Sequence, residues 1–185
     1  ATEPISQITY EVEGQLTTSG QMLSDSEFTF SNSLNSASSN SQQITVNNEK
    51  VSRISINSQG GEPELIISSN VVNQMTYNGS KAKDSITIEE ETLTKKNSTF
   101  NLGKKPDDIT FLGELKKTTV DLGDDKAVDR VTLNSTDQIT AKRLRINNFS
   151  KRDELVIDGE TFLYADLKEE RPEGIKIGFK NDGSL

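Results

Sequence analysis

Apolar residues alternate with polar ones in many short patches along the chain. Ile44-Thr45-Val46, Ile86-Thr87-Ile88 and Val131-Thr132-Leu133 are examples, each with a β-branched or large apolar residue at every second position. A period of two is the repeat of a β-strand with one buried face, and Gly, Asn, Asp and Ser separate the patches. No long segment has the apolar stripe of a surface helix. The one helical candidate, residues 162–170, fits a short strand equally well, so the pattern predicts an all-β chain.

A repeat joins four pairs of these patches into a series. Each copy consists of a strand, a small turn residue, a short polar turn, an Asp and a second strand. The copies follow one another at intervals of about 20 to 25 residues, and a fainter copy precedes them at 54–67. The small turn residues are Gly79, Gly103, Gly123 and Asn148, and the aspartates are Asp84, Asp108, Asp129 and Asp153.

This period is typical of a solenoid, in which each coil stacks on the next. Two three-residue strands cannot bury their apolar positions alone. Stacked coils pair each strand with its equivalents in a parallel sheet and line up the apolar positions inside. We therefore expect a right-handed parallel β-solenoid, similar to a β-helix or β-roll, with terminal β caps. An antiparallel sandwich, whose strands also recur between turns, is the competing fold.

The solenoid repeats are expected over residues 50–160. Residues 1–49 are predicted to form an N-terminal β segment or cap, and their Ser/Asn-rich stretch, 31–42, is interpreted as a loop. Residues 161–185 are predicted to form a C-terminal cap, with 174–179 as the last strand. Open solenoid ends expose unpaired strand edges, so they must be capped or used for association.

Residues 120–133, VDLGDDKAVDRVTL, resemble a degenerate repeat of the RTX, or haemolysin-type calcium-binding, family. Residues 146–157, INNFSKRDELVI, are similar to the segment that often closes such arrays. The resemblance covers residues 70–160. It implies a right-handed parallel β-roll that binds Ca²⁺ in Gly-Asp turns and belongs to a commonly secreted class of protein.

The turns depart from the family pattern at the positions where calcium would bind. Ca²⁺ takes six to eight oxygen ligands, and a cation in the same turn opposes it. The best remaining acidic cluster is Asp124, Asp125 and Asp129, with Asp107 and Asp108 of the preceding coil as further ligands. These residues are the candidate calcium site, and no other cofactor is predicted. The basic turn residues are Lys81, Lys83, Lys104, Lys105, Lys126, Lys151 and Arg152.

These basic residues recur with the Asp column, and a second basic column follows at 95–96, 116–117 and 142–143. One hypothesis is that Lys–Asp ladders between coils replace the calcium ladder and relieve the stacking of like charges. The alternative is that they are solvated turn charges, each pair contributing about 0–1 kcal/mol. The sequence leaves both open.

Composition removes several enzyme classes. The 185 residues include no Cys, His or Trp, and 31% are hydrophobic. Without a thiol or an imidazole, zinc hydrolases, Ser-His-Asp hydrolases and Cys-His proteases are excluded. No apolar run is long enough to cross a membrane as a helix. The formal net charge of -8 disfavours nucleic-acid binding, which depends on neutralising phosphates.

These observations favour a non-enzymatic role. The first expectation is a structural protein of an extracellular assembly, such as a bacteriophage capsid decoration, tail or fibre-associated protein, with protein partners and homo-oligomers. It rests on an acidic, Ser/Thr/Asn-rich β chain with no signal-peptide pattern. The second is a secreted or cell-surface RTX-like calcium-binding module, and the third a carbohydrate-binding or polysaccharide-cleaving solenoid. The expected location is the virion, or alternatively the extracellular space or cell surface.

Overall fold

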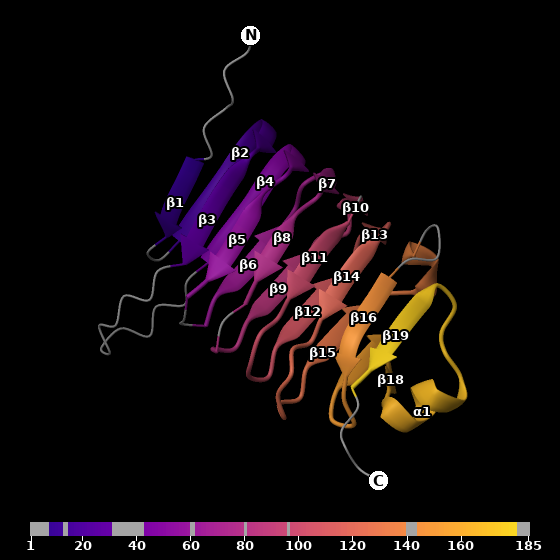
Figure 1. Ribbon diagram of the computed structural model, residues 1–185. Coiled ribbons are helices and arrows are strands. Elements are labelled where there is room, and N and C mark those ends of the chain that lie inside the picture. Colours follow the sequence, from indigo (N-terminus) through magenta and orange to yellow (C-terminus); the bar gives the residue numbers. More distant parts are fainter. Residues whose placement is uncertain are drawn as a thin grey trace.

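The computed structural model describes residues 8–12, 15–30, 43–59, 62–79, 81–95, 97–139 and 144–180. This part of the chain is nearly all β, with one short helix, α1 (Tyr164–Glu169), and one 3₁₀ turn (Thr136–Gln138). Figure 1 shows the strands stacked side by side along one axis.

Two sheets run along that axis. Sheet A consists, in order, of β1 (Ile8–Val12), β3 (Ser26–Phe30), β5 (Ser55–Ser58), β8 (Thr76–Asn78), β11 (Ser98–Asn101), β14 (Thr118–Asp121), β16 (Leu144–Phe149) and β19 (Ile175–Phe179). Sheet B consists of β2 (Gln15–Ser24), β4 (Gln43–Ser52), β6 (Glu64–Ile67), β7 (Val71–Asn73), β9 (Ser85–Ile88), β10 (Leu93–Lys95), β12 (Asp108–Phe111), β13 (Glu114–Leu115), β15 (Arg130–Leu133), β17 (Glu154–Ile157) and β18 (Glu160–Phe162).

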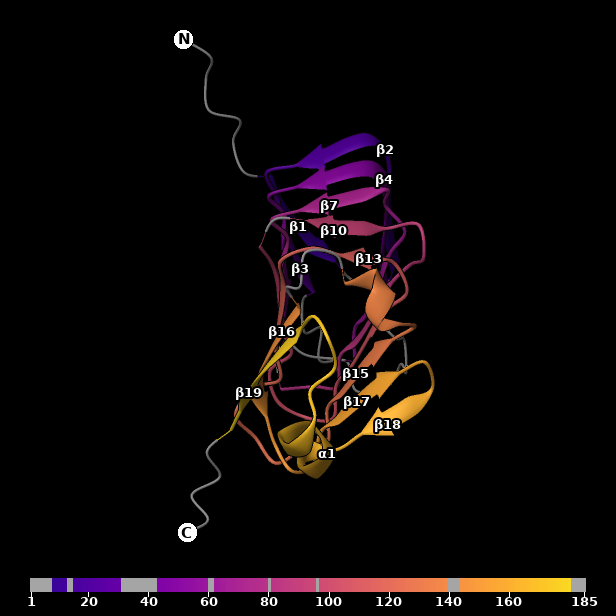
Figure 2. The same cartoon turned by 90° about the vertical axis from the view of Figure 1, so that its right-hand side faces the viewer.

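Each coil passes through sheet A, turns into sheet B and returns to sheet A. The long strand β4 pairs with both β6 and β7 of the next coil, so sheet B is divided into two strips from there on. Sheet B bends between the strips, and Figure 2 shows a cross-section with three sides. The two views show that the coils wind in a right-handed sense.

The predicted parallel β-solenoid is therefore confirmed. Every pairing between described strands is parallel except that of β17 with β18, which rules out the antiparallel sandwich.

The alternating pattern decides which side chains enter the core. In β9, Ile86 and Ile88 are buried, whereas Ser85 and Thr87 face outward. Equivalent positions stack in register, so each strand contributes only one or two inward residues and a low apolar content suffices. One inward column of sheet A contains Phe28, Ile56, Tyr77, Phe100, Val120, Ile146 and Ile177.

The stack begins with β1, before the predicted solenoid boundary at residue 50. β1 pairs with β3, and β2 pairs with β4, in the same parallel manner as the later coils. The coil architecture thus extends into the segment predicted to be an N-terminal cap. The stretch 31–42, predicted to be a loop, lies outside the described residues.

The C-terminal end of the stack is closed by three elements. β19 adds the last strand to sheet A at the predicted position, and β18 turns back along β17. Residues 164–169 form the helix α1 rather than a strand, and Leu167 on this helix is fully buried against the core. Lys168 lies with its Nζ 4.2 Å from the Phe179 ring centroid, which ties the helix to β19.

Candidate functional site

Four aspartates form a buried column where the chain turns from sheet A to sheet B. Asp84, Asp107, Asp129 and Asp153 are each exposed by 2% or less. The carboxylates of the last three accept hydrogen bonds from the backbone N–H of the aspartate one coil earlier, at 2.7, 3.0 and 3.1 Å. These bonds span 23, 22 and 24 residues. We call these four residues the Asp column, and its hydrogen bonds hold successive turns together.

The column contains Asp107 where the sequence pattern predicted Asp108. The strands set this register, because Ile109 pairs with Ile86. Asp108 consequently aligns with Ser85 and lies at an outward position, and the residue before it aligns with Asp84. Two consecutive aspartates made the assignment ambiguous by one position.

Gly79 has no room for a side chain beside this column. A Cβ at Gly79 would collide with the Asp84 carboxylate and with the backbone carbonyl of Leu102. The glycines that stack directly are Gly103 and Gly123, which both have positive φ. Gly79 and Gly123 therefore allow the backbones of neighbouring coils to approach closely, and Gly103 and Gly123 also provide turn residues with positive φ.

Burial opposes ionisation of the Asp column. It raises the pKa of Asp107 to about 8 and that of Asp129 to about 7, and it raises the pKa of Asp153. Backbone N–H donors act in the opposite direction, while neighbouring carboxylates add to the rise. Burial also raises the pKa of Tyr77, whose hydroxyl lies near Asp84. Asp107 therefore keeps its proton at neutral pH, which limits repulsion within the stack.

The predicted calcium ligands Asp124, Asp125 and Asp129 take separate partners. Asp129 belongs to the buried column. Asp125 accepts a hydrogen bond from the Lys105 N–H at 2.7 Å, and its other carboxylate oxygen accepts one from within its own turn. Asp124 is exposed and pairs with Lys180, which lowers the pKa of the Asp124 carboxyl. No group of three or more acidic side chains among the described residues is arranged to hold a metal ion. Calcium binding by this cluster stays a prediction.

Ion pairs between coils lie outside the Asp column. Lys83 Nζ is 3.1 Å from Asp108 Oδ2 in the next coil. Arg130 pairs with Glu154 at 2.7 Å and lies 3.9 Å from Asp108. The Lys–Asp pairing of the hypothesis is thus found at outward positions, whereas three members of the Asp column use backbone donors. Residues 96 and 142–143 of the second basic column lie outside the described residues.

A ladder of amides crosses the outer face of sheet A. Asn101 Nδ2 donates to Asn78 Oδ1, and Asn78 Nδ2 donates to Asn57 Oδ1, each at 2.8 Å. Asn57 then donates to Glu27 Oε1 at 2.7 Å. This polar ladder keeps the coils in register on the side opposite the core.

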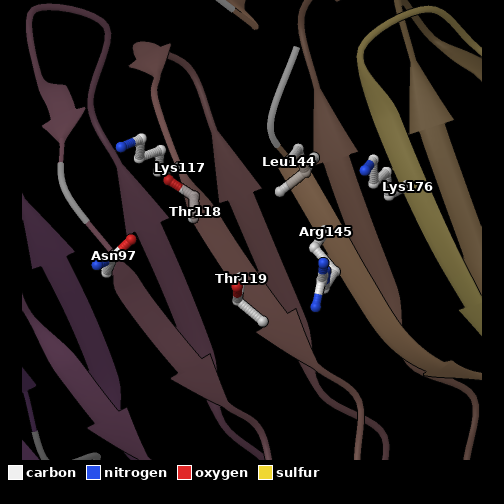
Figure 3. A pocket seen from close by; sticks show the side chains of 7 residues that line it. All are labelled: Asn97, Lys117, Thr118, Thr119, Leu144, Arg145 and Lys176. Carbon is white, nitrogen blue, oxygen red and sulfur yellow. The ribbon is translucent and has the colours of Figure 1, made fainter. Parts of the chain in front are cut away.

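A groove of about 440 Å³ lies on the same face, near the C-terminal end. Figure 3 shows Lys117 and Asn97 on one side of it, Arg145 and Lys176 on the other, and Thr119 between the two sides. We call it the cationic groove. A second hollow of about 410 Å³ shares two of the three cations and adds Arg171.

Sequence reasoning missed this groove because its cations lie far apart in the chain. The register of sheet A brings Arg145 beside Lys176, and Thr119 on the other side of Arg145. One outward row of sheet A changes from hydroxyl side chains to basic ones in its last two strands. This change is visible in the sequence only after coils of unequal length have been aligned.

The N-terminal end of the stack has open strand edges. No described residue pairs with the outer edge of β1 or β2. The ten residues of β2, QLTTSGQMLS, contain no charge, and Met22 is 55% exposed. Most sheet edges carry charges or prolines that prevent pairing with another chain, and β2 carries neither.

Comparisons with known proteins add no family: no family model, curated protein or solved structure matches this chain. No helix within the described ranges has the length and apolar character needed to cross a membrane.

Proposed function

We propose that this chain is a non-enzymatic structural protein of an extracellular assembly, with a phage virion component as the first candidate. The observation that supports it best is the outer edge of β2. That edge runs along a ten-residue strand, every second residue of which directs its backbone N–H and C=O groups away from β4, and no described residue pairs with it. Exposed, uncharged strand edges promote association through β-strand pairing.

The partner that fits this edge is a second copy of the chain. α1 and the β17–β18 hairpin lie at the C-terminal end and obstruct the stacking of a whole N-terminal coil of another copy, although the outer edge of β19 has no described partner. Head-to-tail stacking would also produce an open filament. Pairing of two N-terminal ends around a two-fold axis leaves both closed ends outside and gives a finite dimer.

Sedimentation velocity over micromolar concentrations tests this proposal. We expect the full chain to be a dimer and the double variant Thr17→Lys/Gln21→Lys to be a folded monomer, because both residues are exposed on β2. The matched control is Thr87→Lys/Thr132→Lys, which adds the same charge to outward positions of interior strands. A monomeric full chain, or a control that dissociates equally, would contradict the proposal.

Neighbouring genes test the assignment to a virion. Capsid and tail genes beside this one support a virion component. A type I secretion system in their place supports the secreted RTX-like module and contradicts the virion assignment.

A further inference from the structure

The cationic groove concentrates positive charge on a chain whose formal net charge is -8. Lys117, Arg145 and Lys176 are exposed, and no described acidic residue forms an ion pair with any of them. None of the described residues lining the groove or the adjoining hollow is acidic. Arg145 and Lys176 are neighbours in register on adjacent strands, and unneutralised cations at such positions repel one another, so this arrangement favours an anionic ligand.

We infer that the cationic groove binds an extended acidic polysaccharide, whose carboxylates contact these three cations. Arg145 and Lys176 are neighbours in register on adjacent strands, which lie about 4.8 Å apart in a sheet. This step is close to the rise of one sugar residue in an extended chain, so successive carboxylates meet successive cations. The planar guanidinium of Arg145 accommodates a carboxylate through two parallel hydrogen bonds.

The outward row that contains these two residues supplies further contacts for sugars. Thr76, Thr99 and Thr119 occupy the same row in the three preceding coils. Their hydroxyls both donate and accept hydrogen bonds, as sugar hydroxyls do. The outer face of sheet A therefore provides a track of hydroxyl side chains that leads into the cations.

Other anionic macromolecules fit this groove less well. Single-stranded nucleic acids stack their bases on aromatic side chains, and no aromatic residue lines either hollow. Protein partners are anchored by apolar and aromatic side chains. The apolar residues at these hollows, Leu144 and Ile177, are 0% and 7% exposed, so they offer no such anchor.

Isothermal titration of the full chain with oligogalacturonate at low salt tests the inference. A neutral cello-oligosaccharide of equal length and a single-stranded oligonucleotide serve as competing probes. We expect binding to oligogalacturonate only, with affinity that falls as salt is added because the contacts are exposed. Arg145→Glu/Lys176→Glu is expected to weaken binding by at least about tenfold, because two attractions become repulsions.

The matched control is Lys81→Glu/Lys104→Glu, which reverses two exposed charges in turns away from the groove. It is expected to bind oligogalacturonate as the unmodified chain does, and circular dichroism establishes that each variant is folded. Absence of binding, equal losses in both variants, equal binding of the neutral probe, or tighter binding of the oligonucleotide would overturn the inference. Dimerisation is measured separately, so the failure of one proposal does not affect the other.

Discussion

The two ends of this solenoid differ in what covers their last strands. At the C-terminal end, Leu167 on α1 is fully buried and β18 folds back on β17. At the N-terminal end, β1 and β2 have no described partner on their outer side. The Asp column and the ion pairs of Arg130 and Lys83 also belong to the later coils. The N-terminal coils hold contacts of their own, because Arg53 donates two hydrogen bonds to the Asp25 carboxylate, at 2.6 and 2.7 Å. The two ends therefore differ in what covers them, and the N-terminal end is where we propose association.

The largest expected effect comes from a substitution at the C-terminal end, where α1 packs on the core. Leu167→Ala removes a fully buried side chain, so we expect the free energy of unfolding to fall by about 2–5 kcal/mol. Leu163→Ala is the matched control, because Leu163 is 46% exposed. Urea unfolding followed by circular dichroism measures both. Equal effects of the two substitutions would show that α1 does not close the core.

The Asp column predicts that stability falls as pH rises. Its carboxyls have a higher pKa in the folded chain than in the unfolded chain, so the folded state binds more protons between those values. Each unit of difference corresponds to about 1.4 kcal/mol per group, so we expect the free energy of unfolding to fall by several kcal/mol as pH rises from about 4, the ordinary Asp pKa, to about 8, the pKa of Asp107 in the folded chain.

Thermal unfolding as a function of pH measures this loss. Asp107→Asn/Asp129→Asn is expected to flatten the profile, because an amide keeps a hydrogen-bond acceptor without the titrating charge. Asp137→Asn, at an exposed position, should leave the profile unchanged. A stability that rises through this pH range would show that the column is ionised and paired with cations.

The smallest expected effect concerns calcium. The candidate ligands Asp124, Asp125 and Asp129 already have separate partners. We therefore expect the same melting temperature in CaCl₂ and in EDTA. A large gain in stability with calcium would support the RTX-like interpretation and would require the turn to rearrange.

The repeating coil could be predicted from the sequence because it depends on short local patterns. Inward residues such as Ile86 and Ile109 alternate with polar ones, and the turns are marked by Gly and Asp. Residues 8–30 were not predicted to form coils because their Gly and Asp residues do not follow the spacing of the later repeats, and the sequence 31–42 interrupts that spacing further.

The positions of the candidate sites depend on which residues pair between neighbouring strands. The sequence specifies this register less well than it specifies the existence of the coils. A shift of one residue separated Asp107 from Asp108 and decided which carboxylate is buried. The cationic groove depended on pairing Arg145 with Lys176 across α1 and its connections. The sequence left residues 162–170 open between a helix and a strand, and the packing of Leu167 on the core accompanies the helix at 164–169.

Cysteine cross-linking tests the role of the open end most directly, because the chain has no Cys of its own. Single substitutions Thr17→Cys, Ser19→Cys and Gln21→Cys place one thiol along β2, and Thr132→Cys places one on an interior strand. We expect rapid formation of disulfide-linked dimers through the thiols on β2, fastest at the position nearest the two-fold axis, and none through Thr132→Cys. Absence of cross-linking along β2, or equal cross-linking at Thr132→Cys, would contradict it.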